Sequence, residues 1–415
     1  MTMIIKRDYY LQQLISSKSN NLIKIVTGIR RSGKSFLLFN LFHNHLIETG
    51  ISEDHIIEIA LDDRLNKNLR DPDVILRHIH ERIVDDKLYY IILDEVQMID
   101  EFTDVLNSLL HIRNADVYVT GSNSKFLSKD VVTEFRGRGD EIHLFPLSFA
   151  ELYNSVGGDK FELWKSYYTY GGLPGILELD SDKKKAAYLR SLHETVYLKD
   201  IIERNNLKNS EEFMELMRVM ASCIGSPCNP SKLENTFKSV KNETLDRKTI
   251  SKYLSYMEDA FLIEKSMRYD IKGRKYIGTL SKYYFQDIGL RNALLNFRQV
   301  EENHIMENVI YNELRLRGFC VDVGMVEART AKERKQLEVD FVANMADRRY
   351  YIQSAFAMPD DAKREQECAS LKRIDDSFKK IIIMRDDIKP YHDNNGFYIV
   401  GLMDFLLKPD LMEQL

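Results

Sequence analysis

The chain has 415 residues, of which 44% are hydrophobic and 30% charged, with a formal net charge of −5 at pH 7. This length predicts more than one domain, and the composition excludes a disordered or fibrous protein. No apolar run is long enough to cross a bilayer and the N-terminus lacks a secretion signal, so we expect no membrane partner. Four cysteines without a CxxC pair indicate reduced thiols in a cytoplasmic protein, not a disulfide framework or a zinc site.

Short β-rich runs alternate with helical stretches through the first part of the chain. The runs are LIKIVT (22–27), IIEIAL (56–61), YYIILD (89–94) and DVYVTG (116–121), and one more strand is expected from residue 142. This alternation predicts a mainly parallel sheet with helices on both faces. We therefore expect an α/β fold here.

The first run leads into a candidate phosphate-binding loop. Residues 28–35 (GIRRSGKS) fit the pattern GxxxxGK[ST] without a mismatch, between a predicted strand and a predicted helix. Glycines let backbone N–H groups face the phosphates, Lys34 would reach the β and γ oxygens, and the Ser35 hydroxyl would bind Mg²⁺. The expected nucleotide-binding residues are Gly28, Arg30, Arg31, Ser32, Gly33, Lys34, Ser35 and Phe36.

The third run ends in an acidic pair, Asp94 and Glu95. Asp94 at the end of the strand would hold Mg²⁺ together with Ser35, and Glu95 would polarise the attacking water. A glutamate beside the metal favours hydrolysis over nucleotide binding alone. The guanine-specific pattern NKxD is missing, because residues 66–69 read NKNL. We therefore expect ATP rather than GTP.

Two further catalytic candidates follow in the chain. Asn123 or Ser122, just after the fourth run, could orient the lytic water, although the segment could also be a simple turn. Arg138, preferred to Arg136, precedes the next strand, where ring-forming ATPases present an arginine to a neighbour's γ-phosphate. Such an arginine is worth about 10³–10⁵ in rate. This role would require a nucleotide-dependent homo-oligomer, and the alternative for Arg138 is a solvated basic turn.

The middle of the chain contains a candidate DNA-binding module. Residues 160–222 are almost wholly helical, with a break at GGLPG (171–175). A helix over 231–237, a second helix capped by Thr249 and a hairpin with the basic tip IKGRK follow. Helix, helix and hairpin form a winged helix-turn-helix pattern. One interpretation is duplex DNA contact through the second helix and the basic tip. Against it, the predicted helix exposes Glu258 and Asp259, and many such modules serve only to join domains.

These motifs resemble those of a large group of prokaryotic AAA-like P-loop ATPases, whose C-terminal domain of unknown function is related to PD-(D/E)XK nucleases. The resemblance covers nearly the whole chain and implies ATP binding and hydrolysis, with GGLPG in a helical lid beside the nucleotide. It implies no settled substrate. The stretches that carry it include RDYYLQQL, IKIVTGIRRSGKSFLL, IILDEVQ, VTGSNSKFLS, YGGLPGIL, KYYFQDIGLRNALL, EVDFV and YYIQSA.

The same resemblance implies the frame of a nuclease site near the C-terminus. PD-(D/E)XK enzymes gather two carboxylates and a lysine around Mg²⁺. Asp340 would be the metal ligand, Glu307 a second carboxylate, and Gln353 the start of the motif QxA. Because Ala355 stands where the lysine is needed, we expect a degenerate, inactive site that is kept as a scaffold for DNA or a protein. The candidates for a displaced lysine that would restore activity are Lys363 and Lys372.

The sequence therefore predicts four parts in an α/β protein. They are an AAA-like P-loop ATPase core over 1–155, a helical lid over 156–222, a winged helix-turn-helix over 223–295 and a restriction-endonuclease-like domain over 296–415. The predicted function is hydrolysis of ATP with Mg²⁺, coupled to appended domains that bind duplex DNA or a protein partner. The alternatives are a slow ATP-dependent switch that acts without DNA, and an active Mg²⁺-dependent nuclease.

Overall fold

The structure is a computed structural model that describes residues 5–121, 137–241, 245–329 and 334–414. The chain divides into two compact units, one of residues 1–146 with 259–261 and one of residues 147–258 with 262–415. The predicted positions Ser122, Asn123 and Arg136 lie outside the described residues. Within the described ranges, no helix combines the length and apolar character that a membrane span requires. All four cysteines are free.

The first unit is built on a five-stranded parallel sheet with the order β2-β3-β4-β1-β5. The predicted mainly parallel sheet is thus confirmed, and its fifth strand begins at Gly139, before the predicted residue 142. The central strands β1 and β3 are buried along their whole length, as is usual when helices cover both faces of a sheet. The strands are β1 Ile23–Thr27, β2 Ile56–Ala60, β3 Tyr89–Asp94, β4 Ala115–Thr120 and β5 Gly139–His143.

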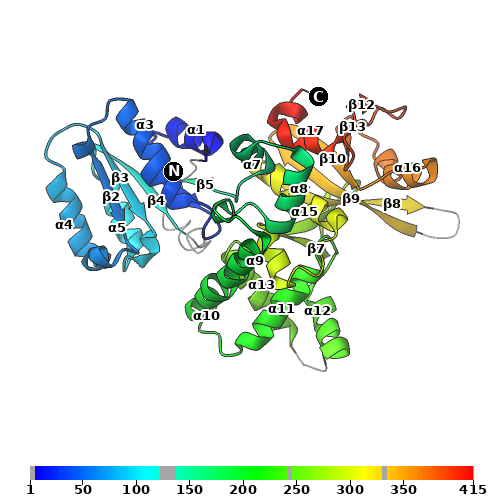
Figure 1. Cartoon of the computed structure of the whole chain (residues 1–415), viewed down its shortest axis with the longest axis horizontal. Helices are drawn as coiled ribbons and strands as arrows, with labels where there is room; N and C mark the ends of the chain where they lie inside the picture. The colour runs from blue at the N-terminus through cyan, green and yellow to red at the C-terminus, as the bar shows by residue number, and fades with distance from the viewer. Residues whose placement is uncertain (1–4, 122–136, 242–244, 330–333, 415) are drawn as a thin grey trace. The chain divides into compact units, whose positions relative to one another are not determined.

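Helices cover both faces of this parallel sheet (Figure 1). On one face, alternate strand residues such as Ile25, Ile91 and Val119 pack with α4 and α5 in one apolar core. On the other face, the Phe42 ring lies 6.3 Å from the ring of Tyr90 and 4.5 Å from that of Tyr118. The helices are α1 Asp8–Ser16, α2 Lys34–Phe36, α3 His43–Glu48, α4 Pro72–Arg82 and α5 Phe102–Leu109, with a π-helical stretch Leu37–Phe42 and 3-10 turns Glu53–His55, Arg64–Arg70 and Val96–Met98.

The second unit contains a mixed eight-stranded sheet with the order β12-β13-β11-β10-β9-β8-β6-β7. The predicted hairpin forms from β6 and β7, which pair antiparallel. Because β6 also pairs in parallel with β8, the hairpin is part of the large sheet. The winged-helix and restriction-endonuclease-like assignments stay predictions. The strands are β6 Ile263–Asp270, β7 Lys275–Phe285, β8 Cys320–Arg329, β9 Arg334–Met345, β10 Arg348–Ala355, β11 Lys379–Met384, β12 Tyr391–His392 and β13 Tyr398–Gly401.

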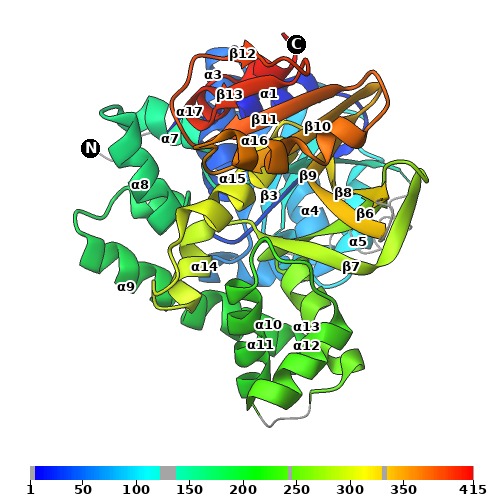
Figure 2. The same cartoon turned by 90° about the vertical axis from the view of Figure 1, so that its right-hand side faces the viewer.

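The helices of the second unit fall into two groups. Helices α15 and α17 pack on one face of the sheet and α16 contributes to the core of the other, whereas α10 to α13 gather together away from α16 and α17 (Figures 1 and 2). The helices are α7 Phe149–Val156, α8 Lys160–Tyr170, α9 Asp182–Leu192, α10 Lys199–Asn205, α11 Ser210–Ser222, α12 Pro230–Thr236, α13 Arg247–Asp259, α14 Ile288–Leu294, α15 Glu302–Leu316, α16 Asp361–Cys368 and α17 Leu402–Leu407. Shorter helical turns are Pro174–Ile176, His193–Leu198, Phe237–Lys241, Leu371–Arg373 and Pro409–Met412.

Helix α13 begins at Arg247, so the predicted cap at Thr249 is wrong. Asp246 is the capping residue, because its Oδ1 accepts hydrogen bonds from the backbone N–H groups of Lys248 and Thr249 at 2.8 and 3.1 Å. An aspartate directly before a helix satisfies these first amides better than a residue inside it. The predicted apolar face is buried and consists of Ile250, Tyr253, Leu254 and Met257.

The GGLPG break follows the end of α8 and packs against the start of α14. The buried Asp287 accepts a hydrogen bond from the Gly172 N–H at 2.8 Å and from the Leu290 N–H at 2.9 Å, and its burial raises its pKa to about 6. A Cβ on Gly172 would lie 2.2 Å from the carbonyl oxygen of Leu147. Close packing within the second unit therefore requires glycine at this position.

Candidate functional site

The loop between β1 and α2 has the backbone shape of a phosphate-binding loop. Gly28 and Gly33 have φ angles of 136° and 99°, and Arg31 is also in the left-handed region at 66°. A Cβ on Gly28 would lie 2.2 Å from the carbonyl oxygen of Leu144, so only glycine fits there. The helical run starts at Lys34 directly after this loop. Backbone N–H groups at such a junction can face an anion.

Lys34 is buried inside this loop, with 5% of its surface exposed. Its ammonium donates to the carbonyl oxygens of Gly28 and Ile29 at 2.9 and 3.1 Å. These carbonyl groups are neutral, so the bonds do not cancel the positive charge. Among the described residues, the buried Oγ of Ser32 has no hydrogen-bond partner. A buried cation and an unused hydroxyl beside backbone amides fit the phosphates of a nucleotide.

Asp94 at the end of β3 is held by two hydroxyl groups. The Ser35 Oγ donates to Asp94 Oδ2 at 2.7 Å, and the Thr120 Oγ1 donates to Asp94 Oδ1. Burial raises the pKa of the Asp94 carboxyl, while these two hydrogen bonds act in the opposite direction. Carboxylate and hydroxyl oxygens are the protein ligands that Mg²⁺ takes. The structure thus brings together the two residues predicted to hold the metal, and their donor set fits it.

Glu95, the predicted catalytic base, follows in the left-handed conformation with φ 53°. Its backbone N–H donates to the Thr120 Oγ1 at 2.9 Å, and its carboxylate accepts a hydrogen bond from the Gln97 side chain. The Thr120 hydroxyl therefore connects the backbone of Glu95 with the side chain of Asp94.

Thr120 and Gln97 are functional candidates that sequence reasoning missed. A signal for Thr120 existed in the strand pattern, because Leu93 pairs with Val119 in the parallel β3–β4 ladder. The next residues of the two strands, Asp94 and Thr120, must then be neighbours. The sequence prediction named Ser122 and Asn123, which follow this strand, and not Thr120, its last residue. Gln97 carried no comparable signal.

Arg7 is a third missed residue, and it supports the loop from the N-terminal segment. It is buried, and its guanidinium donates to the carbonyl oxygens of Ser32 at 3.3 Å and Phe145 at 2.7 Å. The same guanidinium lies over the ring of Tyr10, 4.6 Å from its centroid. The motif RDYY therefore fixes part of the phosphate-binding loop.

The remaining predicted residues of this site are more exposed. Arg31, Phe36 and Arg138 are exposed and Arg30 is half-buried. Arg138 immediately precedes β5, and its carbonyl oxygen accepts a hydrogen bond from the Ile23 N–H at 2.9 Å. That bond positions the Arg138 backbone beside β1, and the side chain is exposed. An arginine finger role for Arg138 stays a prediction.

In the second unit, the predicted carboxylates Glu307 and Asp340 meet around a lysine. The Lys282 Nζ lies 2.8 Å from Glu307 Oε1, 2.7 Å from Glu338 Oε1 and 3.9 Å from Asp340 Oδ1. Asp340 sits in a β-bulge, where two residues of β9 oppose Val323 of β8, and such a bulge redirects side chains. Burial and the neighbouring Glu307 raise the pKa of Asp340 to about 8.

The other residues of the predicted nuclease motif lie elsewhere. Ile352 belongs to the core on the α15 face, whereas Tyr351 and Ala355 belong to the core on the α16 face. Strand alternation therefore places Gln353 on the α16 face, away from the face that carries Lys282 and Tyr284. The proposed replacement lysines pair locally, Lys363 with Glu367 at 2.7 Å and Lys372 with Glu365 at 2.6 Å.

Lys282 was missed, although its strand position carried a signal. It lies two residues before the fully buried Tyr284 on β7, so both side chains point to the same face. A lysine at an inward-facing strand position needs buried partners. Within the described ranges, no group of three or more His, Cys, Asp or Glu residues is placed to hold a metal ion.

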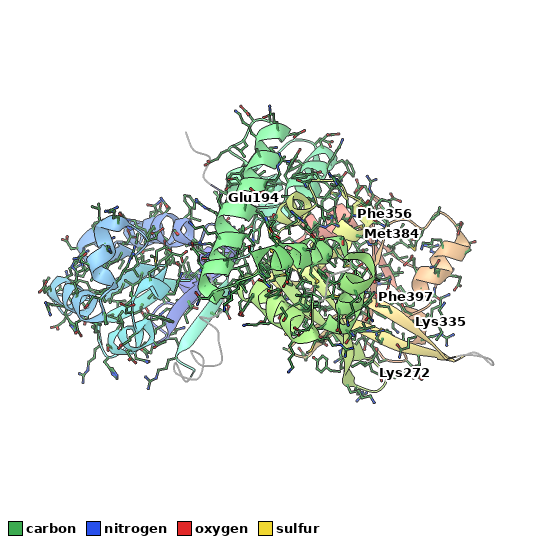
Figure 3. The ribbon with its side chains drawn as sticks, turned by 90° about the horizontal axis from the view of Figure 1, so that it is seen from below. Glu194, Lys272, Lys335, Phe356, Met384 and Phe397 are labelled. Carbon is green, nitrogen blue, oxygen red and sulfur yellow. The ribbon has the colours of Figure 1, made fainter. Side chains whose placement is uncertain are left out.

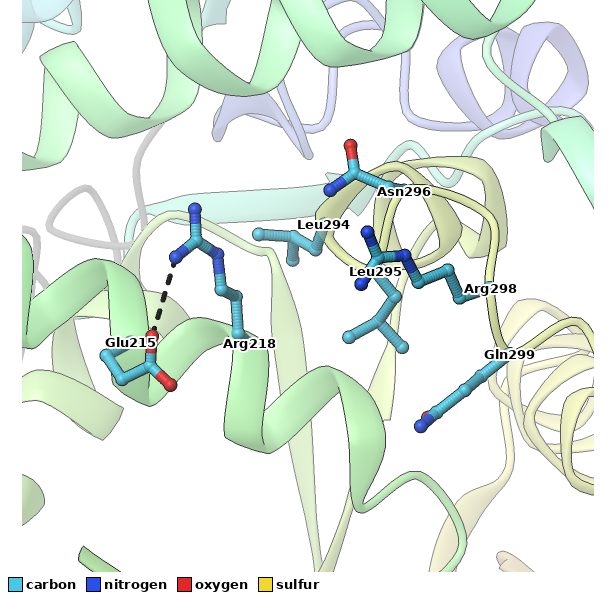
Figure 4. A pocket seen from close by; sticks show the side chains of 7 residues that line it. All are labelled: Glu215, Arg218, Leu294, Leu295, Asn296, Arg298 and Gln299. Carbon is cyan, nitrogen blue, oxygen red and sulfur yellow. Dashed lines mark hydrogen bonds and ion pairs between the residues drawn. The ribbon is translucent and has the colours of Figure 1, made fainter. Parts of the chain in front are cut away.

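A separate pocket of about 460 Å³ lies between α11 and the end of α14 (Figure 4). Arg218 pairs there with Glu215 at 3.4 Å. None of the residues predicted from the sequence lines this pocket. Its lining residues are Glu215, Arg218, Leu294, Leu295, Asn296, Arg298 and Gln299.

Comparison with known proteins assigns a family to most of this chain. The AAA domain family matches residues 20–153, and a domain of unknown function (DUF8612) matches residues 161–301. An uncharacterized protein of Haemophilus influenzae is 33% identical over 98% of this chain and 99% of its own length. An uncharacterized protein of Methanocaldococcus jannaschii is 29% identical over 90% of this chain and 82% of its own length. The Aeropyrum pernix ORC1 protein, solved in complex with DNA, aligns at 12% identity over 71% of this chain and 93% of that chain, with a TM-score of 0.31, which is too low to support an inference.

Proposed function

Because the chain belongs to the family of the Haemophilus influenzae relative and its residues 20–153 match the AAA domain, we propose that it binds MgATP and hydrolyses it. The observation that carries the proposal is the placement of two groups at one edge of the parallel sheet. The buried Lys34 ammonium donates to two neutral carbonyl oxygens, and the Ser35 hydroxyl donates to the Asp94 carboxylate. One group suits the phosphates and the other suits their magnesium.

Each residue has a distinct chemical task in this proposal. Lys34 and the loop amides bind the β and γ phosphates and stabilise the charge that develops on them. Ser35 and Asp94 hold Mg²⁺, which neutralises phosphate charge when it is bound. Glu95 accepts a proton from the attacking water. The Thr120 hydroxyl positions both acidic residues, because it bonds to Asp94 and to the Glu95 backbone.

Turnover and binding measured on two variants test this assignment. Glu95→Gln is expected to bind ATP with unchanged affinity and to hydrolyse it about 10²–10⁴-fold more slowly, since a general base is lost. Lys265→Gln, an exposed change on β6, serves as the control and should behave like the natural protein. Hydrolysis at the normal rate by Glu95→Gln would show that another group is the base.

A slow, switch-like ATPase is the second candidate, and one contact favours it. The Gln97 side chain donates a hydrogen bond to the Glu95 carboxylate. This bond engages a carboxylate oxygen of the proposed base, so Gln97 would act as a brake by holding Glu95 away from the attacking water. Gln97→Ala is then expected to hydrolyse ATP several-fold faster. Slower hydrolysis by this variant would mean that Gln97 positions the base and does not restrain it.

We infer that the second unit binds duplex DNA or a protein partner under control of the nucleotide. The tip of the β6–β7 hairpin exposes Lys272, Arg274 and Lys275, and Figure 3 shows Lys272 at the end of this hairpin. Cations on a protruding tip suit DNA phosphates, and such binding weakens as salt rises. Turnover measured with and without duplex DNA separates the two partners. Stimulation that disappears in Lys272→Ala/Arg274→Ala favours DNA, and equal rates favour a protein.

A nucleotide-dependent homo-oligomer is part of the same proposal. Its basis is the position of Arg138, exposed and directly before β5. Sizing of the protein with and without ATP and Mg²⁺ is the test. An oligomer whose turnover falls about 10³-fold in Arg138→Ala supports a finger acting on a neighbour, whereas a persistent monomer excludes it.

A further inference from the structure

Lys282 is a lysine in the interior of the second unit whose partners are carboxylates. Only 3% of its side chain is exposed, and its Nζ lies 2.8 Å from Glu307 Oε1 and 2.7 Å from Glu338 Oε1. Burial by itself lowers the pKa of Lys282, but Glu307, Asp340 and Glu338 outweigh that effect and raise the pKa above its usual range. The Lys282 nitrogen therefore lies among three carboxyl groups, which favour its ammonium form.

One carboxylate oxygen each of Glu307, Glu338 and Asp340 faces a hydrogen-bond donor. Glu307 Oε1 accepts from the Lys282 ammonium and also from the Tyr284 hydroxyl, both at 2.8 Å. Asp340 Oδ2 accepts from the Ser354 N–H at 2.8 Å. A divalent cation would need these same lone pairs as ligands. The donors on β7 and β10 therefore compete directly with any metal for the cluster.

We propose that the Lys282 ammonium is the resident cation of this cluster and takes the position that a divalent metal would need. The three carboxylates, as they stand among the described residues, are not placed to hold a metal ion, and we expect them to close on a divalent cation only when the ammonium is removed. This proposal does not depend on the ATPase proposal, because none of its residues belongs to the phosphate-binding loop or its neighbours.

The ammonium also fastens an edge strand to the rest of the unit. β7 is the last strand of the sheet, and Lys282 connects it to Glu307 on α15 and to Glu338 on β9. Asn308 of α15 adds two bonds to the backbone of Phe285, at 2.8 and 2.7 Å. Cys228 also forms an antiparallel bridge with Ser281 of β7, and an edge strand engaged in these ways is protected from pairing with another chain. The ion pairs of Lys282 therefore hold β7 against α15 and β9.

Thermal unfolding of the nucleotide-free full chain, in EDTA and in millimolar Mn²⁺, tests the proposal. Lys282→Met removes the ammonium and leaves the carboxylates unpaired, so we expect the Tm to fall by about 5–10 °C in EDTA. Mn²⁺ should restore at least half of that loss, because the cation regains the freed oxygens. Lys282→Met/Glu307→Gln should show no recovery. Lys265→Met, the same change at an exposed position on the adjacent strand β6, should match the natural protein in both solutions.

Other outcomes would overturn the proposal. A Lys282→Met protein as stable as the natural one, or one that Mn²⁺ does not stabilise, would show that the ammonium does not stand in for a metal. If that variant does not fold, calorimetric titration of the natural protein and Asp340→Asn with Mn²⁺ decides. Equal heats of Mn²⁺ titration for the natural protein and Asp340→Asn support the proposal. A bound equivalent of Mn²⁺ that is lost in Asp340→Asn, or Mg²⁺-dependent plasmid cleavage lost in the same variant, contradicts it.

Discussion

Lys34 of the first unit and Lys282 of the second are both buried, and their partners differ. Lys34 in the first unit bonds to the neutral carbonyl oxygens of Gly28 and Ile29. Lys282 in the second unit faces the carboxylates of Glu307, Glu338 and Asp340. A positive charge among dipoles can still attract an anion, whereas a positive charge among carboxylates is already neutralised. The partners of a buried lysine, and not its burial, therefore indicate whether it binds a ligand.

Loss of the Lys34 ammonium should have the largest effect. Lys34→Ala removes charge-assisted hydrogen bonds to phosphate, so MgATP binding should weaken at least about 100-fold and turnover should fall about 10³-fold. Fluorescent nucleotide titration and phosphate release measure the two quantities. Lys282→Met, although less stable, should retain nucleotide binding below its unfolding temperature. Comparable losses in both variants would remove the distinction between the two lysines.

His193 extends the comparison to a buried base. It is 5% exposed and, among the described residues, its Nε2 has no hydrogen-bond partner. Burial and the nearby Arg218 lower its pKa to about 4. The unfolded chain therefore binds more protons between pH 6.5 and 4, and stability falls as the pH falls through this window. The expected loss from this group is about 3 kcal/mol at pH 4.

Denaturant unfolding at pH 7, 5 and 4 measures this effect. His193→Leu should be less sensitive to acid by about the stated amount, because it has no proton to gain. Arg190→Leu, a change on the neighbouring turn of α9 at an exposed residue, should keep the acid sensitivity of the natural protein. If His193→Leu loses stability with acid as steeply as the natural protein, the histidine is not buried in its neutral form.

Gly172 tests whether the GGLPG break is a packing device or a lid. Gly172→Ala should destabilise the protein by about 1–3 kcal/mol, because its Cβ would lie 2.2 Å from the Leu147 carbonyl oxygen. Gly278→Ala on β7 is the matched control, since no atom lies within 4 Å of its added Cβ. Chemical denaturation of both variants gives the difference. Unchanged stability of Gly172→Ala with impaired ATP turnover would favour the lid.

Substitution of Thr120 should have the smallest of these effects, and the effect should be on turnover. Thr120→Val removes the hydroxyl that bonds to Asp94 and to the Glu95 N–H, so turnover is expected to fall about 10-fold while the ATP affinity changes little. Thr236→Val is a suitable control, because its hydroxyl bonds only to a carbonyl oxygen within its own helix. A full rate in Thr120→Val would mean that the strand geometry alone positions both acidic residues.

The first unit could be predicted from the sequence in most of its parts. Its strands alternate with helices, which predicts the parallel sheet. The phosphate-binding motif is one continuous segment, so residues 22–35 show both the local structure and its expected ligand. Asp94 could be placed because a strand end is visible as the last residue of an apolar run. Thr120 needed one more step, the register of β3 and β4, which a motif search does not supply.

The second unit shows where such reasoning fails. The partners of Lys282 lie on α15 and β9, so their meeting depends on the packing of a sheet whose order is not sequential. The bulge at Asp340 also shifts the alternation of β9, so spacing along the chain does not show which side chains share a face with Asp340. Helix caps depend on local sequence, and the start of α13 was misplaced because two capping residue types, Asp246 and Thr249, lie three positions apart.

Calorimetric titration of ATP into the full chain with Mg²⁺ tests the central claim most directly. The account predicts one bound nucleotide per chain for the natural protein and for Lys282→Met, and no measurable binding for Lys34→Ala. Absence of nucleotide binding by the natural protein, or undiminished binding by Lys34→Ala, would contradict it.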